Sequence, residues 1–203
     1  MSRSRALTAV AALVLLRGAL SPAAASAAPT DPAGARVEGL CNGLLDAVKQ
    51  TKTGGVPARA RRIQPLVDDH FNLSVMAQFA VGPAWAKMTP ADRVSVESAL
   101  GRYTAARIAQ EFDAYTGQRC VVDPAVQTRG PDKLVKSQIV EKAEASPVNY
   151  RLREYGGAWK VIDIYYNGVS QLATQRADFA SVLQTGGAAG LTAKLNELAV
   201  KMR

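Results

Sequence analysis

The stretch from 147 to 179 constrains the fold of this chain more than any other. In its first part the apolar side chains of Val148, Tyr150 and Leu152 alternate with polar ones, which is the pattern of a strand with one buried face. A Gly-Gly pair follows at 156–157. Since glycine readily adopts the positive φ angles of a two-residue hairpin turn, the sequence predicts an antiparallel hairpin here.

The second strand of this hairpin, residues 158–166, is apolar on both faces, so we expect both to be covered. After Asn167-Gly168, side chains at three- and four-residue steps mark one face of a helix. They are Val169, Leu172, Arg176, Phe179 and Leu183. Arg176 is the only cation on this otherwise apolar stripe. The pattern predicts a helix packed on the hairpin and carrying one inward-leaning arginine.

Helical spacing and capping signals predict four helices before the first strand, over residues 35–51, 58–70, 73–80 and 90–115. Pro65 predicts a kink or break in the second helix. The fourth has apolar residues on two faces, so it either bends or is covered on two sides. Two further strands are expected at about 119–127 and 134–141, and a last helix after Gly186-Gly187. The fold class is therefore α+β, with a curved four-stranded antiparallel sheet and about six helices.

The N-terminus has the features of a secretory signal peptide. Arg3 and Arg5 precede an apolar run at 6–16 that is too short to span a bilayer, and Ala25-Ser26-Ala27 fits an A-x-A cleavage site. The alternatives are cleavage after Ala25 or an uncleaved membrane anchor. We expect residues 1–27 to be removed and residues 28–203 to form a single domain in the periplasm.

Charge and composition exclude several classes of function. The formal net charge is +8, and removal of the signal peptide lowers the Lys and Arg count from 25 to 22 against 17 acids, leaving about +5. No basic run is interleaved with aromatic residues, so we expect no nucleic-acid binding. His70 is the only histidine and there is no CxxC pair, so we expect no metal site. No cofactor motif is present either.

Two cysteines, Cys41 and Cys120, remain after the signal peptide. In an oxidising compartment they can form a disulfide. Alternatively they are two separate buried thiols, because Cys41 lies on the apolar face of the first predicted helix, where free cysteine is common. The sequence leaves both possibilities open.

Motifs spread along most of the mature chain resemble the toluene-tolerance, or MlaC, family of periplasmic proteins. They are Phe71-Asn72-Leu73 with Met76, Gly82 and Trp85; Thr89-Pro90 with Arg93; Tyr150-Arg151-Leu152-Arg153; Trp159-Lys160-Val161 with Asp163; Gly168-Val169-Ser170; and Arg176 with Phe179. The segments 112–117 and 175–179 look more like a branch of the family linked to hopanoid biosynthesis.

This resemblance implies a soluble lipid carrier without catalytic residues or cofactor. Such a carrier takes a phospholipid from one membrane complex to another, here an inner-membrane ABC-transporter lipid complex and an outer-membrane lipoprotein complex. The acyl chains lie in an apolar pocket between the sheet and the helices. The hopanoid-linked branch leaves open whether the ligand is a phospholipid or a hopanoid-type lipid.

We expect the pocket to be lined by apolar side chains on elements that must converge. These are Phe79, Leu100, Tyr103, Tyr150, Leu152, Val161, Ile164, Val169 and Leu172. From the residues alone, the same pattern also fits an exported interaction domain with a filled core. A third hypothesis is a small pocket enzyme that uses Asp163 or Asp113 as acid or base, although no GxSxG, phosphate loop or metal cluster supports it.

Arg176 has two interpretations. Its guanidinium could bind the phosphate of a lipid at the mouth of the pocket, because planar bidentate donors suit phosphate. Alternatively it forms an ion pair with Asp163 or Asp178 that fixes the last part of the chain on the sheet. We favour the ion pair, since an inward arginine without a permanent partner is costly whenever the pocket is empty.

Overall fold

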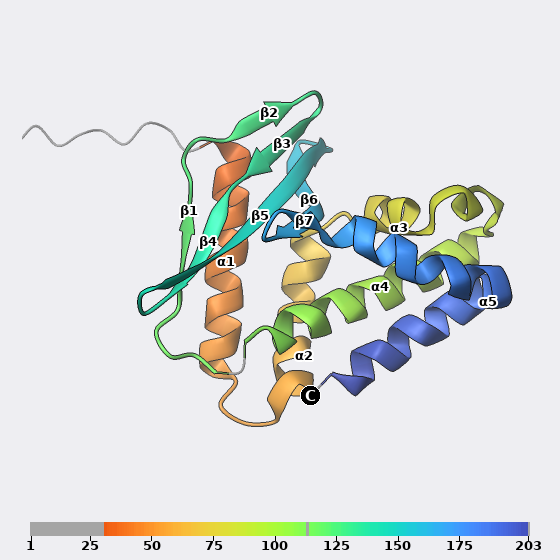
Figure 1. Ribbon diagram of the computed structural model, residues 1–203, viewed down its shortest axis with the longest axis horizontal. Coiled ribbons are helices and arrows are strands. Elements are labelled where there is room, and N and C mark those ends of the chain that lie inside the picture. Colours follow the sequence, from red (N-terminus) through yellow and green to blue (C-terminus); the bar gives the residue numbers. More distant parts are fainter. Residues whose placement is uncertain (1–30, 113, 203) are drawn as a thin grey trace, which may run out of the picture.

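The computed structural model describes residues 31–112 and 114–202, which form an α+β fold (Figure 1). The helices in this part of the chain are α1 (Pro32–Gln50), α2 (Gly55–His70), α3 (Leu73–Val81), the 3-10 helix η1 (Gly82–Lys87), α4 (Pro90–Gln110) and α5 (Gln171–Lys201). The strands are β1 (Arg119–Val122), β2 (Gln127–Arg129), β3 (Asp132–Val135), β4 (Ser137–Glu141), β5 (Glu144–Tyr155), β6 (Ala158–Tyr166) and β7 (Val169–Ser170).

The predicted fold class is thus confirmed. The predicted signal peptide, residues 1–27, lies outside the described residues. Among those that are described, no helix is both long and apolar enough to cross a membrane.

The 12-residue strand β5 holds the sheet together. Its first residues pair with β4, its later residues with β3, and β6 runs along its other edge. All of these pairings are antiparallel. Three short strands extend the sheet: β1 pairs with β4, β2 with β3, and β7 with β6. The described residues therefore form more strands than the four predicted. The first predicted strand, 119–127, ends as β1 at Val122, shortly before Pro124, which cannot donate a backbone hydrogen bond to a neighbouring strand. The second predicted strand, 134–141, is divided at Lys136 into the end of β3 and β4.

The hairpin that the sequence predicts is present. Gly156 and Gly157 form its two-residue turn, with φ angles of 57° and 81°. In β6 the pairing register shifts by one residue, which makes Ile162 an extra, bulged residue. As a result, four consecutive side chains of β6 are buried, as expected for a strand covered on both faces. They are Val161, Ile162, Asp163 and Ile164.

The helices pack beside and against this sheet (Figure 1). α4 begins with a capping box between Thr89 and Asp92, as its sequence indicates, and ends at Gln110, five residues earlier than predicted. It contacts both α2 and α5, so its two apolar faces are covered on two sides. α2 continues through Pro65, so the break expected as one possibility there does not occur.

The two helices predicted around Gly186-Gly187 are the two halves of α5. Gly187 has φ 57° and ψ −151°, a conformation open essentially to glycine alone, and it bends the chain sharply. The second half then packs on α4, with the side chains of Leu191 and Leu195 completely buried. This anchors the C-terminal end of the chain to the helical layer (Figure 1).

Candidate functional site

A cavity of about 510 Å³ lies between the sheet and the helices α1 and α4. Its apolar lining comes from both layers: Leu40, Leu44, Leu45, Phe71, Ile108 and Phe112 on the helical side, and Ile139, Val148, Tyr150, Ile164 and Tyr166 on the sheet side. Helical spacing places the three leucines on one face of α1, and strand alternation places Val148 and Tyr150 on the same face of β5. We call this space the sheet–helix cavity.

The rim of the sheet–helix cavity is polar. Glu111, Glu144 and Asn167 are exposed and mark its opening to solvent, together with the half-buried Glu141 and Arg107. Arg107 and Glu111 form an ion pair of 3.8 Å, one helical turn apart. The cavity therefore combines an apolar interior with a charged opening, which suits an amphipathic ligand.

The polar atoms that reach the interior are uncharged. Burial, with the nearby carboxylate of Glu111 as a second cause, raises the pKa of Tyr166 to about 12. Burial also raises the pKa of Tyr150. Both phenols are therefore neutral at any physiological pH and can only offer or accept a hydrogen bond.

Two of the predicted lining residues, Tyr150 and Ile164, face the sheet–helix cavity. Three others, Leu100, Leu152 and Val161, are at most 1% exposed and belong to the packed core. They do not line the cavity.

The remaining predicted residues lie elsewhere. Leu172 is buried beside a small separate cavity of about 30 Å³, and the half-buried Tyr103 packs edge-to-face on Phe179 with ring centroids 6.5 Å apart. Phe79 and Val169 are exposed. The prediction missed the wall formed by α1, although its stripe of Leu40, Cys41, Leu44 and Leu45 is visible in the sequence and could have identified it.

The ion pair expected for Arg176 is not formed with any described residue. Asp163 instead accepts hydrogen bonds from the Ser170 hydroxyl at 2.6 Å and from the backbone N–H of Leu172 at 3.2 Å. It thus fastens the start of α5 to β6. Arg176 is exposed and lies away from the sheet–helix cavity, against Gly82. The structure corrects the expectation that this side chain leans inward to a carboxylate.

The groups considered for catalysis are not arranged for it in the part of the chain that is described. Asp163 is held in the structural hydrogen bonds above, and Asp113 lies outside the described residues. His70 ends α2 as a buried side chain, with Nε2 3.5 Å from Asp69. Over the described residues, no three His, Cys, Asp or Glu side chains gather in a way that could hold a metal ion.

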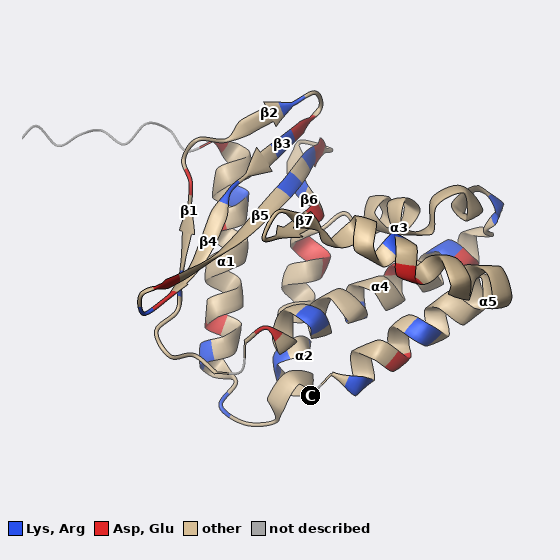
Figure 2. Ribbon diagram, in the orientation of Figure 1, with Lys and Arg blue, Asp and Glu red and all other residues tan. Residues whose placement is uncertain are grey.

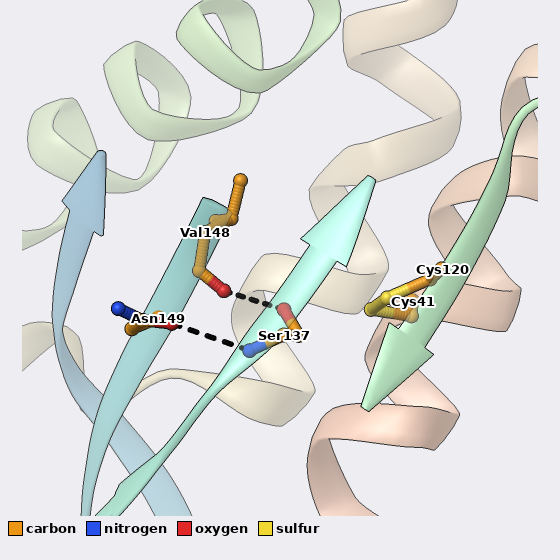
Figure 3. The surroundings of a disulfide bond; sticks show 5 residues. All are labelled: Cys41, Cys120, Ser137, Val148 and Asn149. Carbon is orange, nitrogen blue, oxygen red and sulfur yellow. Dashed lines mark hydrogen bonds between the residues drawn. A yellow bond between two sulfur atoms is a disulfide. The ribbon is translucent and has the colours of Figure 1, made fainter. Parts of the chain in front are cut away.

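The two cysteines are joined, which resolves the alternatives left open by the sequence. Cys41 on α1 and Cys120 on β1 form a disulfide, with Cα atoms 5.9 Å apart (Figure 3). Cys41 also lines the sheet–helix cavity. Beside the bond, Ser137 of β4 is tied to β5 by bonds to the Val148 carbonyl and the Asn149 side chain. The disulfide therefore connects the helical wall of the cavity to the outer edge of the sheet.

Comparisons with known proteins agree with this architecture. The structure of a phospholipid-binding protein from Ralstonia solanacearum, in complex with a phospholipid, matches with a TM-score of 0.67 and 22% sequence identity. The match covers 85% of this chain and 99% of that one, and at this identity it shows a common fold. The MlaC protein family matches residues 39–197, well over half of the sequence. This chain belongs to the MlaC family.

Proposed function

We propose that this protein is a periplasmic lipid carrier that holds the apolar part of a lipid in the sheet–helix cavity. The observation that carries the proposal is the cavity itself, whose apolar interior opens at a charged rim. Membership of the MlaC family supports it. So does the phospholipid bound by the similar R. solanacearum protein, which makes a phospholipid the first candidate ligand. A hopanoid-type lipid is the second.

The energetics suit a carrier rather than a storage protein. Burial of an acyl chain of about 16 carbons at about 0.8 kcal/mol per methylene gains on the order of 10 kcal/mol over water. A bilayer offers the same apolar environment, so transfer between the protein and a membrane is nearly balanced. The cavity volume of about 510 Å³ lies in the range of ordinary ligand sites.

We propose that the bound chain contacts Tyr150 and Ile164 on the sheet side. To these two predicted residues the geometry adds the leucines of α1 with Phe71, Ile108 and Phe112. The polar head would remain at the rim near Arg107 and Glu111. Arg176 is excluded from this site, because it borders none of the cavity.

A carrier between two membranes also needs export and partners. We propose that residues 1–27 direct export and are removed, and that residues 28–203 work as one lipid-binding domain. The partners would be an inner-membrane ABC-transporter lipid complex and an outer-membrane lipoprotein complex. These proposals rest on the sequence motifs and on the family.

Of the competing hypotheses, a domain with a filled core does not agree with the sheet–helix cavity. The enzyme hypothesis is weakened for Asp163, its first candidate acid or base, because both oxygens of this carboxylate accept structural hydrogen bonds. We therefore propose binding without catalysis.

Mass spectrometry of an organic extract of the purified protein tests the proposal. Ile139→Trp would place an indole in the cavity from β4, and we expect it to lower the bound lipid at least severalfold. Gln138→Trp is the matched control, since Gln138 is the neighbouring residue of the same strand, is exposed and does not line the cavity. Lipid-free extracts from the folded parent, or equal lipid in both variants, would contradict the proposal.

A further inference from the structure

Arg176 lies at the centre of a groove on the outer face of the sheet. Three adjoining hollows, of about 470, 220 and 470 Å³, all have Arg176 in their walls. Their other walls come from the end of α3, the start of η1, the strands β5 and β6, and the first half of α5. The side chains used below are Phe79, Pro83, Arg151, Arg153 and Tyr155. We call this surface the Arg176 groove.

The Arg176 groove and the sheet–helix cavity lie on opposite faces of the same strands. Arg151 borders the groove, whereas its neighbour Tyr150 faces the cavity. Likewise Tyr165 of β6 borders the groove and Ile164 faces the cavity. Successive side chains of a strand point to opposite faces, so a ligand in the groove leaves the cavity and its rim unobstructed.

The guanidinium of Arg176 lies against Gly82. A Cβ atom built on Gly82 would lie only 3.0 Å from Nη2 of Arg176, so the glycine makes room for the guanidinium. Gly82 also has a φ of 66°, a value that favours glycine. The guanidinium is thus positioned at the α3–η1 junction rather than extended freely into solvent.

The accessible charge of the groove is positive. Asp163 borders the groove and Asp132 bonds to two of its arginines, so both carboxylates already have hydrogen-bond partners. Asp132 is 1% exposed and bonds to Arg151 and Arg153, and Asp163 is 6% exposed and bonds to Ser170. No ion pair joins Arg176 to a carboxylate among the described residues. Figure 2 shows the cations on β5 and on the first half of α5 that contribute to this surface.

An exposed aromatic ring lies beside this cation. Phe79 of α3 is 44% exposed and borders two of the three hollows that contain Arg176. Pro83 and Tyr155 add further apolar surface. A guanidinium prefers planar carboxylates, and an exposed phenyl ring gains from covering by apolar atoms.

We propose that the Arg176 groove is a docking site for a partner protein, which inserts a short segment carrying a carboxylate flanked by apolar side chains. The carboxylate would bind Arg176 and an apolar neighbour would cover Phe79. An anionic bilayer is a poorer match, because one uncompensated cation attracts it only weakly. Binding here is independent of what occupies the cavity.

NMR titration with synthetic peptides tests this site. The probe is an acetylated hexapeptide of alternating leucine and aspartate, and the reference is the same peptide with asparagine for aspartate. We expect the acidic peptide to shift the amide signals of Phe79 and Gly82 and the side-chain Nε–Hε signal of Arg176. The asparagine peptide should bind about fivefold more weakly or worse. Shifts confined to other parts of the molecule would overturn the proposal.

Variants identify the side chains responsible. Arg176→Gln should weaken the acidic peptide about fivefold or more, and Phe79→Ser should weaken both peptides. The matched control is Arg61→Gln, an exposed arginine of α2 that borders none of the three hollows, and it should leave binding unchanged. Equal affinity of Arg176→Gln and the parent would overturn the proposal. An Arg176-dependent response to inorganic phosphate or phosphatidylglycerol vesicles, but not to the acidic peptide, would also overturn it in favour of a phosphate or membrane site.

Discussion

Loss of the Cys41–Cys120 disulfide should be among the most destabilising single changes in this protein. The bond joins residues 79 positions apart, and it ties α1 to the edge strand β1. In the chain-entropy treatment a closed loop of this length is worth about 4.5 kcal/mol at 25 °C, because it restricts the unfolded chain. Cys120→Ser should therefore lower the free energy of unfolding by about 3–5 kcal/mol, equivalent to roughly 10 °C in Tm for a chain of this size.

Chemical denaturation under oxidising conditions measures this change. Cys120 is half-buried, so serine at this position removes little core packing and the result reports mainly on the cross-link. The matched control is Val121→Ser, an exposed neighbour on the same strand, for which we expect a cost below about 1 kcal/mol. Addition of dithiothreitol to the parent protein should reproduce the Cys120→Ser value. A loss below about 1 kcal/mol for Cys120→Ser would refute the loop-entropy reasoning.

The same variant should change the sheet–helix cavity. β1 pairs with β4, which contributes Ile139 and Glu141 to the cavity lining, and Cys41 contributes from α1. Without the disulfide this wall is held by hydrogen bonds and packing alone. We therefore expect bound lipid to exchange into acceptor vesicles faster from Cys120→Ser than from Val121→Ser.

Two further changes probe the supports of the fold. Burial lowers the pKa of His70 below its usual 6.5, and the cations Arg36 and Lys160 reinforce this shift while Asp69 opposes it. The unfolded chain then binds more protons than the folded one, so the free energy of unfolding should fall as the pH drops below about 6.5. Denaturation at pH 7.5 and at pH 5.5 should therefore show a smaller difference in stability for His70→Gln than for the parent. Asp163→Ala leaves the N–H of Leu172 without its acceptor, so it should lower the free energy of unfolding in urea by about 2 kcal/mol. Asp163→Asn should recover part of this loss. An unchanged midpoint for Asp163→Ala would contradict the structural role of Asp163.

Local signals in the sequence predicted most of the elements. The Gly156-Gly157 turn, the capping box at Thr89 and the apolar periodicity of the helices act over a few residues, so they can be interpreted without knowing the fold. The Gly186-Gly187 pair marked the bend in α5 for the same reason.

Features that depend on pairing between distant segments were not predicted. The sheet divides at Lys136 because β4, which follows it, pairs with the first part of β5, whereas β3, which precedes it, pairs with the later part. The bulge at Ile162 depends on the register of β5 and β6. Asp163 borders one of the hollows around Arg176, yet its oxygens bond to the start of α5 instead of to the arginine. Which groups a buried carboxylate meets is thus set by the tertiary arrangement and not by its neighbours in sequence.

The cavity illustrates a deeper limit, because a leucine that faces a void and a leucine that faces a neighbour are identical in sequence. What differs is how far the opposing layers stand apart. A closed and empty space of about 510 Å³ would cost about 12 kcal/mol at about 24 cal/mol per Å³, which is comparable with the whole stability of a typical domain. The opening at Glu111, Glu144 and Asn167 lets solvent relieve part of that cost, and a ligand that binds only the folded chain offsets more of it. A chain that keeps such a space is therefore most stable when the space is filled, which is the physical reason to look for a lipid inside it.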